Sequence, residues 1–133
     1  MPAMLMVHER DPREALKDKI GPVDDFELFN NQVLCAVYIR PEKTRGGIML
    51  PDSTRDEDKN QGKVGLVLKV GENAFKDSSG KWTWPQDIGV GDWVYFRASD
   101  GWAITLNGQK DNLCRILDDV DIRGRIQHPD QVW

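Results

Sequence analysis

A long polar stretch, residues 40–62, is the sequence feature that most constrains the fold of this chain. It joins two strand-like runs, residues 33–39 and 63–70. Compact domains seldom contain connections longer than about 12–15 residues unless the connection is functional or disordered. Inside the stretch, one apolar triplet, Ile48-Met49-Leu50, follows the pair Gly46-Gly47. Because the loop offers these three side chains no apolar neighbours, we expect them to enter a pocket on another protein.

The composition is that of an ordinary globular domain. The chain has 133 residues, of which 39% are hydrophobic and 30% charged, and this length favours one domain. The net charge of −4 argues against a nucleic-acid-binding protein, because phosphate contacts need a basic face. No apolar run is long enough to cross a membrane, and residues 1–10 lack the pattern of a secretory signal. The expected location is therefore the cytoplasm.

Short strand-like runs recur along the chain at fairly regular spacing, with little helix between them. This pattern is typical of a small all-β sandwich or barrel. The runs after the first two lie at residues 92–97, 102–106, 113–117 and, more weakly, 121–126. We expect an N-terminal arm over residues 1–31, a β-barrel domain over 32–126 and a C-terminal tail over 127–133.

Local signals define the turns between these runs. A short helix is expected from Asp11 to Ile20, with Asp11 as the N-cap, Pro12 at the first helical position and Gly21-Pro22 as the stop. The turn sequence at residues 77–80 lies between apolar flanks and predicts a hairpin. Asn107-Gly108 is the strongest two-residue hairpin signal in the chain.

Residue types that carry chemistry do not cluster here. His8 and His128 lie near opposite ends of the sequence, without partners at metal-ligand spacing, and we expect both to face solvent. The acidic run 56–58 lacks the spacing of a calcium loop, and the aspartates at 118–121 are expected to form a turn and strand edge. No nucleotide-binding or nucleophile motif occurs. We therefore expect no metal, no cofactor and no enzymatic activity.

Cysteines and tryptophans are interpreted mainly as packing residues. Cys35 and Cys114 lie in strand-like runs and are expected to be buried free thiols, with a disulfide as the alternative. Trp93 and Trp102 are expected in the core or at the mouth of the barrel. Residues Trp82 and Trp84 have period-two spacing and point the same way, so they either pack on the barrel or face a partner or cavity.

Taken in order, these segments resemble the GroES-type co-chaperonin family. The matching segments cover about residues 32–126: a first strand at 33–39, the loop core Gly46-Gly47-Ile48-Met49-Leu50, a strand from Gly62-Lys63-Val64 to Val70-Gly71, Val90-Gly91-Asp92-Trp93-Val94-Tyr95-Phe96, Leu106-Asn107-Gly108 and Asp118-Asp119-Val120-Asp121-Ile122. The family's Arg-Pro-Leu-x-Asp-Arg opening is replaced here by residues 25–31, and extra residues lie at both ends.

The resemblance implies a GroES-like β-barrel with a long mobile loop and a roof hairpin. It implies that residues 46–50 bind a nucleotide-bound GroEL-type chaperonin, that Trp82 and Trp84 belong to the roof over a cavity, and that subunits assemble into a homo-oligomeric ring, most simply a heptamer. The extra terminal residues resemble a phage-encoded member, which would act in the host cytoplasm. The alternative is a structural component of a phage particle, in the capsid or neck, that uses the same barrel.

Overall fold

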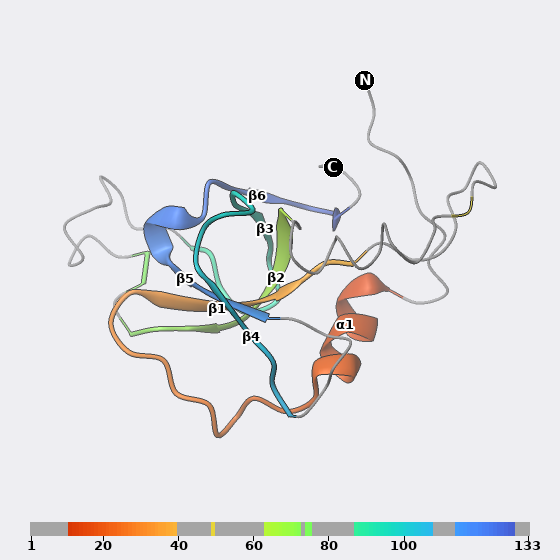
Figure 1. The fold of residues 1–133 in the computed structure, drawn as a ribbon, viewed down its shortest axis with the longest axis horizontal. Helices are drawn as coiled ribbons and strands as arrows, with labels where there is room; N and C mark the ends of the chain where they lie inside the picture. The colour runs from red at the N-terminus through yellow and green to blue at the C-terminus, as the bar shows by residue number, and fades with distance from the viewer. Residues whose placement is uncertain are drawn as a thin grey trace.

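One short helix and six short strands dominate the regular structure in the part of the chain that the computed structural model describes, residues 11–39, 49, 63–72, 74–75, 87–107 and 114–129. Figure 1 shows their arrangement. In chain order they are α1 (Pro12–Ile20), β1 (Gln32–Val37), β2 (Val64–Val70), β3 (Trp93–Tyr95), β4 (Trp102–Ile104), β5 (Cys114–Asp118), the 3-10 turn η2 (Asp119–Asp121) and β6 (Gly124–Ile126).

The six strands form one antiparallel sheet in the order β4-β5-β1-β2-β3-β6. The sheet curves round on itself (Figure 1), as expected for a small barrel. β1 and β2 lie at its centre, and the register between them shifts at Leu34/Cys35, where a bulge bends the strand. The predicted all-β class is therefore confirmed.

The central strands are buried on both faces, and the helix explains why. One cluster, on the face of Leu34 and Leu66, also contains Leu16 and Ile20 of α1. A second cluster on the opposite face is built around Val33, Val67 and Val94, with Phe75 and Ile122 closing it. Because α1 and the segment that follows it cover one face of the sheet, both faces of β1 and β2 are buried. Their sequences are therefore continuous apolar runs and do not alternate between apolar and polar residues.

The local sequence encodes α1 as predicted. Asp11 is the N-cap, and its side chain accepts a hydrogen bond from the backbone N–H of Arg13 at 3.0 Å. Pro12 occupies the first turn, where its missing N–H costs nothing. Gly21 ends the helix with φ of 83°, a conformation that favours glycine. The helix therefore begins and ends where its caps dictate.

The β4–β5 hairpin differs from the tight turn predicted at Asn107-Gly108. Trp102 pairs with Ile116, and Ile104 pairs with Cys114. A two-residue turn at 107–108 would place Leu106 opposite Gln109, a register that these pairs exclude. Asn107 does adopt the left-handed conformation typical of turns, with φ of 55°. The turn conformation predicted at Asn107 is confirmed, whereas the register of the described pairs does not fit a two-residue hairpin; Gly108 itself lies outside the described residues.

Candidate functional site

The long stretch between β1 and β2 leaves the sheet from a hydrogen-bonded stem. The backbone N–H of Tyr38 donates to the carbonyl of Val64 at 2.8 Å, and the N–H of Phe96 donates to the carbonyl of Lys63 at 2.8 Å. The ring of Tyr38 also packs edge-on against Trp93, with 5.7 Å between ring centroids. The chain is therefore held firmly on both sides of residues 40–62.

Met49 is the one residue of the predicted binding segment that lies within the described part of the chain. Its side chain is 59% exposed. Gly46, Gly47, Ile48 and Leu50 lie outside the described residues, as do Trp82 and Trp84. The side chain of Met49 is therefore not part of the barrel core.

The two tryptophans expected in or near the core behave differently. Trp93 is 2% exposed and belongs to the cluster that α1 covers. Trp102, on the end strand β4, is 59% exposed. The core position predicted for Trp102 was wrong, because β4 lies at an end of the strand order and pairs only with β5 among the described strands. A position at the mouth of the barrel stays a prediction.

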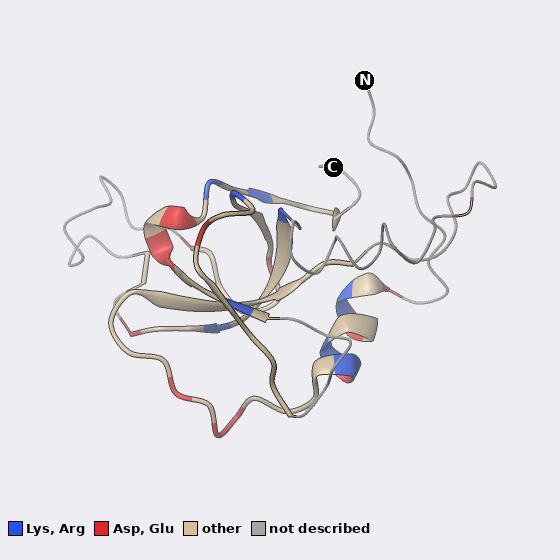
Figure 2. Cartoon of the chain, in the orientation of Figure 1, with Lys and Arg blue, Asp and Glu red and all other residues tan. Residues whose placement is uncertain are grey.

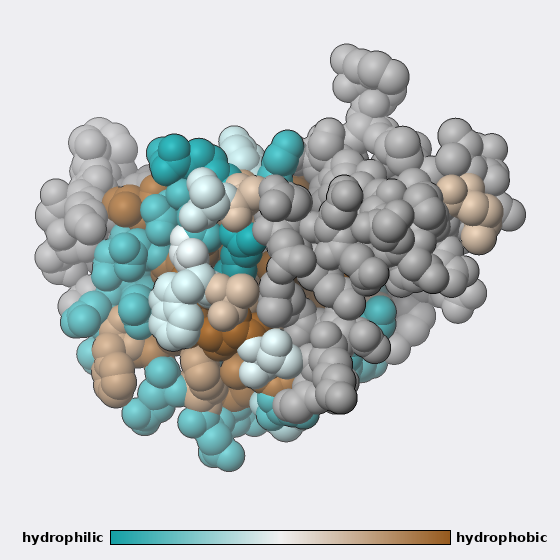
Figure 3. Space-filling model, viewed as in Figure 1, coloured by the Kyte–Doolittle hydropathy of each residue, from teal (hydrophilic) through white to brown (hydrophobic). Residues whose placement is uncertain are grey.

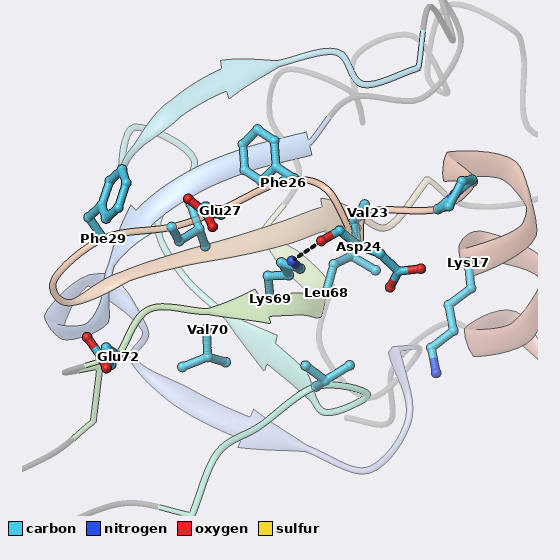
Figure 4. Close-up of a pocket in the computed structure, with 14 residues that line it drawn as sticks. Lys17, Val23, Asp24, Phe26, Glu27, Phe29, Leu68, Lys69, Val70 and Glu72 are labelled. Carbon is cyan, nitrogen blue, oxygen red and sulfur yellow. Dashed lines mark hydrogen bonds between the residues drawn. The ribbon is translucent and has the colours of Figure 1, made fainter.

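A groove of about 810 Å³ lies between the α1–β1 connection and the sheet (Figure 4). Apolar side chains from both parts line it, and Lys69 crosses it to donate a hydrogen bond from Nζ to the backbone carbonyl of Asp24 at 3.1 Å. Two of its lining side chains are strongly exposed, Phe29 at 68% and Val90 at 62%. On the face drawn in Figure 3, hydrophobic residues likewise reach the surface between hydrophilic ones.

Asp119 is a buried carboxylate whose importance the sequence did not reveal. Its side chain is fully buried, with Oδ1 accepting from Asn31 Nδ2 at 3.0 Å and Oδ2 accepting from the backbone N–H of Phe75 at 2.9 Å. It belongs to η2, which stands out as an acidic turn in Figure 2. Asp119 therefore joins the start of β1 to the turn after β2. As predicted, this acidic run forms a turn.

Arg125 on β6 ties the sheet to the chain that leads into β3. Its guanidinium contacts Asp87 at 3.0 Å and Asp92 at 3.4 Å. The charge of Asp87, together with the hydrogen bond to Asp92, raises the pKa of Arg125. Asp87 and Asp92 therefore form ion pairs with Arg125 at the edge of the sheet.

Comparison with known proteins identifies the family. The profile described as "Chaperonin 10 Kd subunit" matches residues 25–126, which is most of the chain. The chain belongs to this co-chaperonin family. It is 36% identical over 100 residues to the co-chaperonin GroES of Pelagibacter ubique, a match that covers 75% of this chain and 98% of that protein.

Other relatives of this co-chaperonin have similar names and coverage. The chain is 38% identical over 100 residues to co-chaperonin GroES 1 of Rhodopseudomonas palustris, covering 75% of this chain and 93% of that protein. It is 34% identical over 102 residues to co-chaperonin GroES 2 of Mesorhizobium japonicum, covering 77% and 89%. The predicted family is therefore confirmed. The matched region, residues 25–126, begins after α1.

The cysteines of this co-chaperonin are buried free thiols, as predicted. They belong to different clusters, Cys35 on one face of the sheet and Cys114 on the other, so a disulfide between them is excluded by the fold. Burial raises the pKa of Cys114 to about 12 and raises that of Cys35 further. Both thiols are accordingly neutral and unreactive at physiological pH.

Neither a metal cluster nor a membrane-spanning helix occurs among the residues that the structure describes. Within them, no three His, Cys, Asp or Glu side chains come together as metal ligands. The helices described there are also too short and too polar to cross a bilayer. The features that stand out are therefore the stem of the long loop, the exposed groove and the two ends of the sheet.

Proposed function

We propose that this co-chaperonin caps a nucleotide-bound GroEL-type chaperonin through residues 46–50 and so assists ATP-dependent protein folding in the cytoplasm. The single observation that carries the proposal is the apolar triplet Ile48-Met49-Leu50, set in a long polar loop that springs from a hydrogen-bonded stem. The exposed side chain of Met49 supports it. The family matches support the co-chaperonin function and lend no support to a phage-particle component.

The energetics favour weak binding by each loop. Burying three such side chains yields roughly 1.5–3 kcal/mol each. Ordering the residues around them costs about 1–2 kcal/mol per residue in backbone entropy. Because these contributions nearly cancel, one loop binds weakly, and Gly46-Gly47 supplies the freedom to bend into a groove. Several loops on one ring would bind strongly together, since each later contact is intramolecular.

A ring of identical subunits, seven by resemblance, follows from this reasoning. Two features of the barrel support self-association: β4 and β6 are the end strands of the sheet, and Phe29 and Val90 are exposed at the groove. End strands with free backbone groups readily pair with another chain. Sedimentation at micromolar concentration should give a single oligomer, and a stable monomer would contradict the proposal.

The chaperonin contact is tested by capture from solution with and without ADP or ATP. Ile48→Ser and Leu50→Ser should abolish nucleotide-dependent capture while thermal melting and sedimentation stay unchanged. Met49→Ser is the matched control with a smaller effect, because alternate residues of an extended segment face opposite ways and methionine is adaptable. A serine variant at 48 or 50 that melts normally and still binds would overturn the proposal.

Trp82 and Trp84 complete the proposed assembly as part of a roof hairpin over the centre of the ring. The turn sequence at residues 77–80 between apolar flanks supports this assignment. Arg125 and Asp87 would then brace the end of the hairpin that leads into β3, through their 3.0 Å contact.

A further inference from the structure

We infer that α1 is a positioning element for the chaperonin-binding loop: docked on the barrel and fastened by Asn107, it holds the stem from which residues 40–62 emerge. The inference rests on the proposed function and extends it. α1, Pro12–Ile20, precedes the region matched by the family, residues 25–126. The capping residues Asp11 and Gly21 explain where the helix begins and ends. They do not explain why the helix packs on this face of the sheet.

The helix docks on the face of the sheet that carries the stem. Leu16 and Ile20, 8% and 1% exposed, lie in the same cluster as Tyr38 and Val64, the residues that close the stem. Figure 1 shows α1 beside the sheet, and β2 is the strand that it approaches. The two buried helix residues therefore supply part of the apolar cover over the stem.

Asn107 fixes the helix at its C-terminal end. Its Nδ2 donates to the carbonyl of Ile20 at 2.7 Å and to the carbonyl of Pro22 at 3.0 Å. The last carbonyls of a helix have no partner within the helix, so these bonds satisfy groups that would otherwise need water. A side chain at Gly21 would lie 3.1 Å from the same Nδ2, which shows how closely the two segments approach. The β4–β5 connection thereby locks α1 onto the sheet.

A firm stem lowers the cost of ordering the loop when it binds. If α1 detaches, Tyr38 and Val64 lose apolar cover, and the hydrogen bond between them opens more often. The proposed contact then binds less well, because a stem that opens often must be ordered again on binding and preorganisation reduces that entropy loss. In a ring, a modest loss at each loop is compounded over all the loops that engage together.

The test uses the full chain with Asn107→Asp, which tolerates the left-handed conformation but lacks the amide donor. Hydrogen exchange of the Tyr38 and Phe96 amides should quicken by about tenfold relative to the amides of β5, as expected for local opening. The half-saturating concentration for chaperonin capture in ADP should rise by about threefold or more. Lys69→Ala is the matched control, since it removes the bond to Asp24 at the other end of β2 and should change neither measurement.

Leu16→Ala is a second variant, which weakens the packing of α1 on the sheet from the helix side. Sedimentation checks that every variant keeps its oligomeric state. The inference is overturned if either variant speeds hydrogen exchange at the stem but still captures the chaperonin normally. It is also overturned if a variant captures the chaperonin less well while hydrogen exchange at the stem is unchanged. The proposed function is judged separately. If Ile48→Ser abolishes capture while Asn107→Asp binds normally, only the positioning role fails. If Ile48→Ser still binds, the loop assignment itself fails.

Discussion

Replacing Asp119 by alanine should be among the most destabilising single changes in the barrel. The carboxylate is fully buried and accepts hydrogen bonds from the Asn31 side chain at 3.0 Å and the Phe75 backbone at 2.9 Å. Its own N–H donates to the carbonyl of Asn31 at 2.9 Å, a backbone bond that the substitution leaves in place. The effect therefore reports on the side chain of Asp119 and not on this backbone bond.

The magnitude follows from those two bonds. Hydrogen bonds to a charged group contribute about 1.5–3 kcal/mol each, and a buried N–H left without a partner adds a desolvation cost of similar size. We expect Asp119→Ala to lower the free energy of unfolding by about 3–5 kcal/mol, a large part of the 5–15 kcal/mol typical of a domain. Near the midpoint this corresponds to a fall in Tm of about 11–18 °C for a chain of 133 residues.

Urea unfolding at a fixed subunit concentration measures this loss, since assembly makes stability concentration-dependent. Asp119→Asn should fall between wild type and Asp119→Ala, because one oxygen remains as an acceptor. Asp121→Ala is the control in the same turn: it removes an exposed bond from the N–H of Asp118 at 3.2 Å and should cost less than about 1 kcal/mol. If Asp119→Ala costs no more than this control, the reasoning about its burial is wrong.

The remaining predictions concern the thiols and the dependence of stability on pH. Neither Cys35 nor Cys114 should react with a thiol reagent in the folded protein, and both should react after unfolding; rapid native labelling would contradict their burial. Because burial raises both thiol pKa values, stability should decline as pH rises above about 8.5, where the unfolded thiols ionise. Hydrogen bonds from Arg97 lower the pKa of Asp100, so the ionised carboxylate should stabilise the fold above about pH 4, and this stabilisation should be lost as pH falls further. Urea titrations of Asp100→Asn should therefore show a smaller loss of stability at acidic pH than those of the wild type.

Sequence patterns located the strands well because an apolar run bounded by turn residues is a local feature of the sequence. The run predicted at residues 33–39 became β1, Gln32–Val37, and the run at 63–70 became β2, Val64–Val70. The helix was also correct, since its N-cap and its terminating glycine are adjacent in sequence to the residues they control. By contrast, the register of the β4–β5 ladder depends on how the whole strands pair, and the Asn107-Gly108 signal alone did not set it.

Whether a side chain is buried also depended on neighbours that the sequence does not name. Trp102 alternates like a core residue, but its strand lies at an end of the sheet and leaves it exposed. The mixed, charged segment around α1 gave no sign that Leu16 and Ile20 complete a core cluster. Such outcomes follow from topology, because the same apolar residue is buried in a central strand and exposed in an end strand.

The long loop and the contacts that hold the barrel together differ in how far the sequence reveals them. The triplet at residues 48–50 was conspicuous because it lacks apolar neighbours nearby in sequence. The bonds of Asp119 to Asn31 and of Asn107 to Ile20 join residues 88 and 87 positions apart, and no local signal identifies the distant partner. A polar residue that satisfies a distant buried group looks like any turn residue until the fold is known. The family of this chain could thus be predicted from local motifs, whereas the contacts between distant residues that hold the barrel together emerge only from the structure.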